Sequence, residues 1–282
     1  MTEKEPVLRV EDLSVSIIKN KKEIPVLKDI SFCVNEGERW AIAGESGAGK
    51  SMTMNAITAL LPDGSSRISG RILFRLQDDS WQDLLEIPYK KRHAFIADQV
   101  AVIFQDSINA LNPNERILRQ WGQTVRLHSP GISREALLSH LMKRMEIFGV
   151  QGGEETLRHF PDQLSGGMRQ RIAIAMALES PARILIADEP TTSLDAINQR
   201  NTVEFIRRLI NDSRRTLLYI SHNLGLLQYI CDHIMILKDG EMVEQGTTDE
   251  LFFHGKNPYT RQLVRETIKI MGADPDRFAV WP

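Results

Sequence analysis

The sequence predicts an α/β fold, with a phosphate-loop core and a mostly parallel sheet, on two observations. Residues 44–51 read Gly-Glu-Ser-Gly-Ala-Gly-Lys-Ser and fit the phosphate-binding loop pattern G-x-x-x-x-G-K-[ST]. The octet follows the largely apolar run 39–43 and precedes a helical pattern over 52–61, which is the context that the pattern requires. In the second half of the chain, apolar strands alternate with helical segments, as in a parallel sheet with helices on both faces.

The composition of the octet suits a loop that binds a polyanion. Gly44, Gly47 and Gly49 lack a side chain, so the backbone amides can converge on phosphate oxygens. A helix is expected from about Gly49, with its N-terminal amides and dipole facing the phosphates. Lys50 can then reach the β- and γ-phosphates, and the Ser51 hydroxyl can bind Mg²⁺. The predicted binding set also includes the neighbouring residues Glu45, Ser46, Ala48 and Met52.

A second group of functional residues follows the apolar strand predicted over 184–187. That strand delivers two carboxylates, Asp188 and Glu189, to a loop edge. Asp188 is placed to hold Mg²⁺ through water, and Glu189 lies where an attacking water must be polarised. An acid pair that only caps the strand is the alternative interpretation. The phosphate loop in the same chain favours the catalytic one.

A third element, Leu164-Ser-Gly-Gly-Met168, leads directly into a predicted helix over 168–179. Ser165, Gly166 and Gly167 therefore offer a second set of free amides and a hydroxyl to a phosphate. Because one chain rarely needs two such cradles for one nucleotide, we interpret this element as serving the nucleotide of a partner.

The other segments complete the outline of the fold. Short β-type segments in the first third suggest a small antiparallel sheet around the core; they span 7–10, 13–18, 24–34, 70–76 and 81–85. Residues 134–148 carry a helical apolar pattern in a stretch without strand signals. Further strands are predicted at 100–104, 216–220, 234–238 and 241–245, and further helices at 198–210, 224–229 and 259–270.

Composition limits the possible classes of protein. The 282 residues are 26% charged and 42% hydrophobic, as in a soluble globular protein with a substantial core. A formal net charge of −2 gives no basic field for nucleic acid. Cys33 and Cys231 match no ligand spacing, and both are expected to be buried in a reducing compartment. Neither a secretory signal nor an apolar run of about 18 residues is seen, so the chain is expected in the cytoplasm.

Taken together, these residues resemble the ATP-binding-cassette (ABC) ATPases over about residues 7 to 270. Six pieces occur in family order: the phosphate loop 44–51, Gln105 after a strand, 164–168, 184–189, Ser193-Leu-Asp195 and Ser221-His222. The resemblance implies a head-to-tail dimer in which each ATP lies between one subunit's phosphate loop and the other subunit's Ser-Gly-Gly element.

The same resemblance implies roles for single residues. Gln105 contacts Mg²⁺, the attacking water and a membrane partner; Asp195 communicates across the dimer; and His222 contacts the γ-phosphate. Ile17 stands where the family usually stacks an aromatic ring on adenine, and an aliphatic side chain there still covers the base with less stacking.

The family's organisation implies a single cassette over 1–282 with a phosphate-loop NTPase core. Its core and antiparallel β subdomain would comprise 1–105 and 180–250. An inserted helical subdomain would span 106–179, and a C-terminal helix and tail would span 251–282.

A narrower resemblance is to the oligopeptide, dipeptide and nickel importer ATPases, carried by 104–113, 168–178 and 254–263. It implies an ATPase, with ATP and Mg²⁺, at the cytoplasmic face of the plasma (inner) membrane as a peripheral subunit. It would energise uptake of peptides, nickel or a related solute through two permease subunits, with an extracytoplasmic solute-binding protein acting indirectly. The partner ATPase is either an identical chain or a paralogue.

Two other functions are alternatives for a chain with these motifs. A nucleic-acid-linked ATPase of the same superfamily typically carries a long coiled-coil insertion or two cassettes, and neither is present in this sequence. An exporter ATPase shares the cassette core, but exporters often fuse membrane helices to it. The importer-type segments favour the first interpretation, and no nucleic-acid partner is expected.

Overall fold

The computed structural model describes residues 5–105, 110–190, 202–208, 210 and 215–270. Its first layer is an antiparallel sheet with the strand order β2-β1-β4-β5. The strands are β1 (Pro6–Lys19), β2 (Lys22–Asn35), β4 (Ser66–Arg75) and β5 (Trp81–Asp83). This sheet is the antiparallel one that the sequence predicts.

The second layer is a six-stranded sheet with the order β10-β9-β3-β8-β7-β6. Its strands are β3 (Arg39–Ala43), β6 (Val100–Ile103), β7 (Ile184–Asp188), β8 (Thr216–Ile220), β9 (His233–Lys238) and β10 (Glu241–Thr247). β6, β7, β8, β3 and β9 run parallel, and β10 returns antiparallel to β9. The predicted mostly parallel sheet is therefore confirmed.

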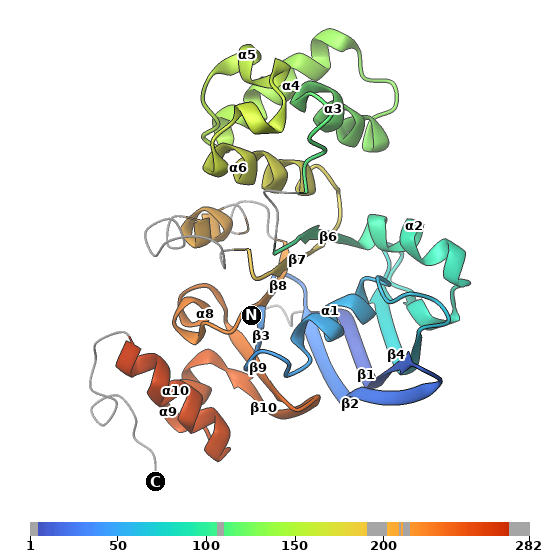
Figure 1. The fold of residues 1–282 in the computed structure, drawn as a ribbon, viewed down its shortest axis with the longest axis vertical. Helices are drawn as coiled ribbons and strands as arrows, with labels where there is room; N and C mark the ends of the chain where they lie inside the picture. Colours follow the sequence, from blue (N-terminus) through green and yellow to red (C-terminus); the bar gives the residue numbers. More distant parts are fainter. Residues whose placement is uncertain (1–4, 106–109, 191–201, 209, 211–214, 271–282) are drawn as a thin grey trace.

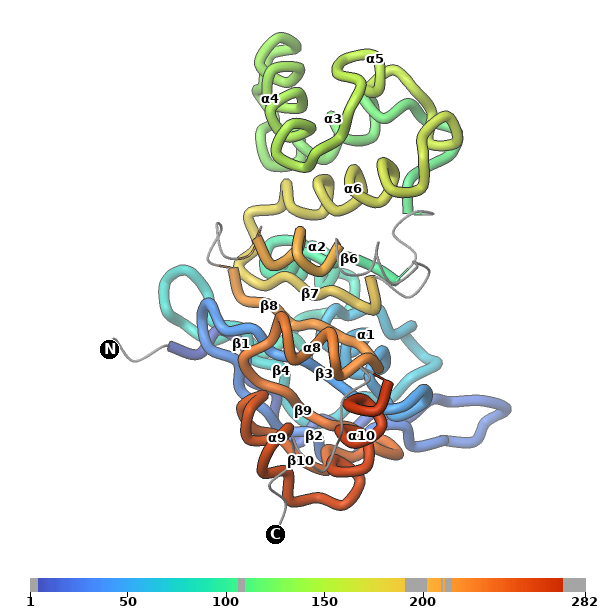
Figure 2. Tube along the Cα trace, turned by 90° about the vertical axis from the view of Figure 1, so that its left-hand side faces the viewer, coloured from blue at the N-terminus to red at the C-terminus, as the bar shows by residue number. Residues whose placement is uncertain are grey.

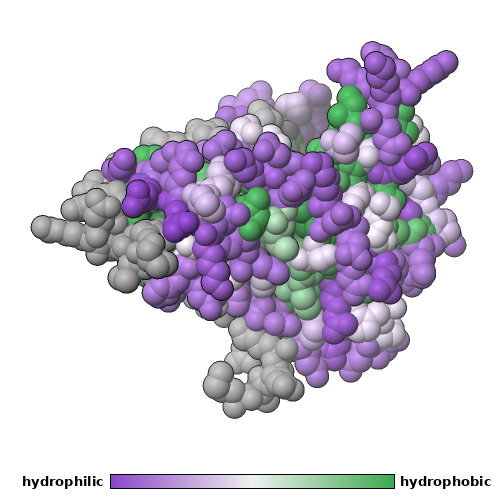
Figure 3. Space-filling model, turned by 90° about the horizontal axis from the view of Figure 1, so that it is seen from below, coloured by the Kyte–Doolittle hydropathy of each residue, from purple (hydrophilic) through white to green (hydrophobic). Residues whose placement is uncertain are grey.

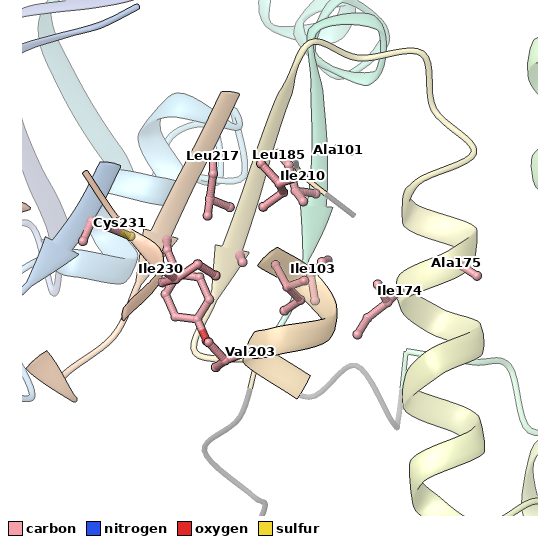
Figure 4. Packing of buried hydrophobic residues seen from close by; sticks show 14 of the residues in the cluster. Ala101, Ile103, Ile174, Ala175, Leu185, Val203, Ile210, Leu217, Ile230 and Cys231 are labelled. Atoms are coloured by element: carbon pink, nitrogen blue, oxygen red, sulfur yellow. The ribbon is translucent and has the colours of Figure 1, made fainter. Parts of the chain in front are cut away.

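Both faces of the sheet are buried along its five parallel strands, which explains why these strands are almost continuously apolar, whereas the edge strand β10 is exposed to half-buried. Along β8, Leu217 and Tyr219 belong to one apolar cluster, whereas Leu218 and Ile220 belong to the other. The first cluster joins the sheet to the helices, and Figure 4 shows Ala101, Leu185 and Leu217 on neighbouring strands of it. The second cluster joins the sheet to the antiparallel layer and the helix after the phosphate loop.

The helices fall into separate groups, as Figures 1 and 2 show. One group forms the upper end of the molecule and contains α3 (Ile117–His128), α4 (Arg134–Ile147), α5 (Gly153–Arg158) and α6 (Gly166–Ala177). At the opposite end lie α9 (Thr248–His254) and α10 (Pro258–Ile270), with α8 (Leu224–Ile230) beside the sheet. α1 (Lys50–Ile57) and α2 (Tyr89–Gln99) lie on the side of the antiparallel layer.

Seen from below, the surface is mostly hydrophilic, with hydrophobic residues in small groups (Figure 3). Within the part of the chain that the structure describes, no helix is both long and apolar enough to cross a membrane.

Two sequence-based expectations about the antiparallel sheet are wrong. The segments 7–10 and 13–18 are one strand, β1, whose register shifts between Val10 and Leu13; Asp12, in the shift, has a φ of 50°. The shift is a β-bulge, which interrupts the pattern of burial without ending the strand. Cys33 is exposed rather than buried, because Phe32 and Val34 on either side of it point to the core. Cys231 is buried as expected.

A buried carboxylate, Glu179, ties the upper helices together. Its oxygens accept hydrogen bonds from Trp121 Nε1 at 3.0 Å on α3 and Arg144 Nε at 3.0 Å on α4, and His140 Nε2 lies 2.8 Å away. Arg215, next to β8, donates to the carbonyl oxygens of Leu178 at 3.4 Å and Ser180 at 2.7 Å. The end of α6 is thus held both by the upper helices and by the sheet.

We expect Glu179→Ala to lower the free energy of unfolding by about 2–4 kcal/mol, because it leaves the Arg144 guanidinium and the Trp121 N–H without their buried partner. Chemical denaturation followed by circular dichroism measures the change. Glu154→Ala is the control, since Glu154 pairs with Arg158 on an exposed helix surface and its loss should cost less than about 1 kcal/mol. Equal effects of the two substitutions would contradict the role of Glu179.

Candidate nucleotide-binding site

The phosphate loop follows β3, and α1 begins at Lys50 with Gly49 as its N-cap. The expected strand–loop–helix order is present. Gly44, Gly47 and Gly49 have φ values of 145°, 85° and 107°, which L-residues with a side chain rarely adopt. A Cβ at Gly44 would lie 2.3 Å from the carbonyl oxygen of Leu237, and one at Gly49 would lie 2.5 Å from Leu27 Cδ2. The loop therefore depends on glycine at both positions.

Other parts of the loop differ in exposure. Glu45, Ser46 and Gly47 are exposed, whereas Ala48 is buried beneath them. In the first turn of α1, Ser51 is exposed and Met52 is half-buried. The exposed residues of the loop, with the Ser51 hydroxyl at one end, leave it accessible to a nucleotide phosphate.

Three parallel strands bring the predicted catalytic residues to the same edge. The phosphate loop follows β3, Asp188 ends β7 with Glu189 next to it, and His222 lies two residues beyond β8. The strand ends are in register, because Asp188 pairs with Ile220, and Ser221 N donates to Ile42 O at 3.2 Å. Ligand sites of parallel sheets lie outside the carboxyl ends of the strands, as this one does.

Glu189 connects two of the other side chains at this edge. Its Oε1 lies 2.9 Å from His222 Nδ1 and 4.0 Å from Lys50 Nζ. Glu189 has a φ of 42°, a left-handed conformation that is uncommon outside glycine. Strained backbone of this kind concentrates at functional sites, where the surrounding structure fixes it.

Lys50 is almost completely buried, and its ammonium group donates hydrogen bonds to the backbone of the loop. Its Nζ donates to the carbonyl oxygens of Gly44 and Glu45, both at 2.9 Å. Burial lowers the pKa of Lys50, and the charges of Glu189 and Asp188 oppose that shift. The site therefore places the Lys50 ammonium group close to two carboxylates, those of Glu189 and Asp188.

Of the two carboxylates, Asp188 has the negative charge that its surroundings stabilise less. Burial, with the charge of Glu189, raises its pKa to about 6, and Lys50 opposes the rise. Its Oδ1 is buried and accepts no hydrogen bond from the described residues. A buried carboxylate oxygen of this kind is suited to a divalent cation or to a water that the cation holds.

The remaining predicted site residues lie outside this group. Gln105 is exposed two residues after β6, and in the described part of the chain it is not a member of the network of Lys50, Glu189 and His222. Ile17 is half-buried near the end of β1, where it pairs with Ile24 and Ser66. Asp195, together with Ser193, lies outside the described residues.

The Ser-Gly-Gly element lies in the upper helical group, away from the phosphate loop. Ser165 is the N-cap of α6, and its hydroxyl accepts from Met168 N at 3.3 Å. Ser165 and Gly167 are exposed, and Gly166 is half-buried. In Figure 2, β6 and β7 lie between α6 and α1, so the two predicted cradles of one chain are separate.

Sequence reasoning missed the contacts that support the loop from other elements. Gly240 N, in the turn between β9 and β10, donates to Ala48 O at 3.1 Å. The Tyr259 hydroxyl on α10 accepts from Glu45 N at 3.4 Å. Gln170 on α6 donates to Pro190 O at 2.8 Å, one residue after Glu189. Gln170 and Tyr259 lie in segments that resemble the importers, but no local pattern shows what they touch.

Comparison with known proteins agrees with this geometry. Residues 27–192 match the ABC transporter family. The dipeptide transport ATP-binding protein DppD of Bacillus subtilis (strain 168) is 35% identical, over 99% of this chain and 84% of that protein. The oligopeptide transport ATP-binding protein OppD of the same strain is 35% identical, over 92% of this chain and 71% of that protein.

A solved structure supports the fold. The ATP-binding cassette MJ0796, a dimer in a post-hydrolysis state bound to ADP and Pi, has a TM-score of 0.71 and 24% sequence identity. The similarity covers 86% of this chain and 98% of that one. The match over residues 27–192 and the two relatives at 35% identity establish that this chain belongs to the ABC transporter family, as an ATP-binding-cassette ATPase.

Proposed function

We propose that the chain binds MgATP on residues 44–51, hydrolyses it with Glu189, and so energises uptake of peptides through partner permeases. The observation that carries the proposal is the meeting of Lys50, Glu189 and His222 at one sheet edge, with Glu189 Oε1 2.9 Å from His222 and 4.0 Å from Lys50. The relatives DppD and OppD are named as transport ATP-binding proteins for dipeptides and oligopeptides, and they favour peptides over nickel as the solute.

Residues of this chain fit a magnesium ion beside the phosphates. Asp188 Oδ1, which is buried and has no hydrogen-bond partner among the described residues, and the exposed Ser51 hydroxyl would hold it, and Gln105 would complete the set from the end of β6. Bound there, Mg²⁺ supplies positive charge to the phosphate oxygens during transfer. A cation would also compensate the burial that raises the pKa of Asp188.

Positioning and charge account for the proposed hydrolysis. Phosphoryl transfer requires little covalent help, so its catalysis depends on orienting water and stabilising charge. Glu189 would accept a proton from the attacking water or orient it, and its hydrogen bond with His222 would fix the carboxylate. Lys50 would supply positive charge to the β- and γ-phosphates.

We expect Glu189→Gln to bind MgATP with near-normal affinity and to hydrolyse it about a hundred- to ten-thousandfold more slowly, the range for loss of a general base. The amide keeps the shape of the side chain but is a poor proton acceptor. Calorimetry measures binding, and release of inorganic phosphate measures turnover. Glu154→Gln, on the exposed surface of α5, is the matched control. Near-normal turnover of Glu189→Gln would remove Glu189 from this role.

A head-to-tail dimer is part of the proposal, because each chain carries two half-sites that lie apart. The phosphate loop precedes α1, whereas Ser165 caps α6 in the upper helical group. A nucleotide bound to the loop of one subunit would meet the Ser165–Gly167 amides of the other. The MJ0796 cassette, which shares the fold, was solved as a dimer.

Mixing Lys50→Ala with Ser165→Arg chains tests the divided site. Each homodimer lacks one half of both sites, whereas a mixed dimer keeps one intact site, so random pairing should restore about a quarter of the wild-type sites. Phosphate release by the mixture and by each variant alone measures the recovery. Full activity of a monomeric Ser165→Arg chain would exclude a shared site. If the native partner is a paralogue, the same two substitutions are divided between the two proteins.

Uptake measurements test the proposed substrate class. Cells that lack this chain should lose growth on dipeptides or oligopeptides as the source of a required amino acid. The wild-type chain should restore growth, and Glu189→Gln should not. Uptake of radioactive nickel in the same strains distinguishes the alternative: loss of nickel uptake with normal growth on peptides would overturn the peptide assignment while leaving the ATPase intact.

A further inference from the structure

Tyr259, in the first turn of α10, is a buried residue whose hydroxyl reaches the phosphate loop from a distant part of the chain. Its side chain is only 8% exposed. The hydroxyl oxygen accepts a hydrogen bond from the backbone N–H of Glu45 at 3.4 Å. The ammonium group of Lys238 lies 4.6 Å from the centre of the tyrosine ring. The ring is therefore held between the phosphate loop and Lys238 at the end of β9.

The contact falls on the same peptide group that Lys50 holds. The carbonyl oxygen of Gly44 accepts from Lys50 Nζ at 2.9 Å, and the N–H of Glu45, which belongs to that peptide, is directed to Tyr259. Gly44 has a φ of 145° and lies against the Leu237 carbonyl. The conformation of the loop therefore depends on how this peptide is oriented. Lys50 and Tyr259 clamp its two ends.

The turn that carries Tyr259 is itself held firmly. The Glu244 carboxylate, on β10, accepts from the backbone N–H groups of Lys256 at 2.7 Å and Asn257 at 3.0 Å. The Asn257 side chain then accepts from Tyr259 N at 2.9 Å. The hairpin of β9 and β10 also contacts the loop through Gly240. The same hairpin therefore holds both the loop and the turn that precedes Tyr259.

We propose that Tyr259 is a positioning residue for nucleotide binding, which fixes the Gly44–Glu45 peptide so that the phosphate loop is already shaped for the phosphates. This rests on the proposed role of residues 44–51. A γ-phosphate competes with the Gly44 and Glu45 carbonyl oxygens for Lys50, whereas Tyr259 holds the N–H end of the peptide whichever partner Lys50 takes. Burial raises the pKa of Tyr259, so the neutral hydroxyl persists in the physiological range.

Tyr259→Phe is the decisive variant, because it removes the hydroxyl and keeps the ring and its packing. We expect the Kd for MgATP, measured by calorimetry on the full chain, to rise about two- to tenfold, as for loss of one neutral hydrogen bond. The KM for MgATP should rise in parallel, and kcat should change by less than about twofold, because the loop is held alike before and during the reaction.

Tyr89→Phe is the matched control. The Tyr89 hydroxyl also accepts a backbone N–H, from Asp63 at 3.2 Å, but it lies at the start of α2. Its removal should leave the Kd for MgATP at the wild-type value. A wild-type Kd for Tyr259→Phe as well would overturn the proposal.

Thermal unfolding separates positioning from general stability. For Tyr259→Phe, the midpoint without nucleotide should match that of the wild-type chain, while the increase on adding MgATP should be smaller. A lower midpoint without nucleotide, together with wild-type affinity, would assign Tyr259 a structural role only and overturn the proposal. Lys50→Ala tests the loop separately: if it binds MgATP as well as the wild-type chain, the role of residues 44–51 fails, whatever Tyr259 does.

Discussion

Burial of the five parallel strands on both faces of the sheet is the constraint on which the rest of the structure depends. Apolar residues alternate between two clusters along β8, so no side chain of that strand is free to carry chemistry. Polar groups must lie beyond the strand ends, and parallel strands bring those ends to one edge. The phosphate loop, Asp188, Glu189 and His222 meet there for this reason, although about 180 residues separate the first from the last.

The charges of the side chains at this edge of the sheet do not cancel. Lys50 faces two carboxylates, and the left-handed backbone at Glu189 directs one of them to His222 and Lys50. Asp188 has a buried oxygen without a hydrogen bond from the described residues and a pKa raised to about 6. Such an arrangement is costly for folding alone, because a buried carboxylate is stabilised best by a cation or a full set of donors. Cost of this kind is typical of sites shaped for ligands.

The sequence was sufficient for the elements whose signals are local. The glycines of the loop, the apolar run into Asp188 and the strands predicted at 234–238 and 241–245 each have local signals, and the structure has these elements where the patterns predict. Four other helices carry weaker signals, and no predicted helix covers them: α2, α3, α5 and α9. The local pattern predicts a break where β1 has a bulge and predicts a buried Cys33 where the side chain is exposed, because both features depend on how the strands pair. The hydroxyl of Tyr259 at the loop depends on contacts between residues more than 200 positions apart, which no local pattern records.

One contact joins the helix that follows the Ser-Gly-Gly element to the residue after Glu189. Gln170 is buried on α6, the helix that begins beside Ser165, and it donates to the carbonyl oxygen of Pro190, next to Glu189. α6 therefore cannot turn relative to the loop after Glu189 without breaking a buried hydrogen bond, and a broken buried bond costs more than an exposed one. At its other end, α6 leads to Glu179 and the Arg215 contacts, which join the upper helices to the sheet. In the proposed head-to-tail dimer, a nucleotide at the Ser165 end of α6 would thus be connected to the residue after Glu189 through this helix and the Gln170 hydrogen bond.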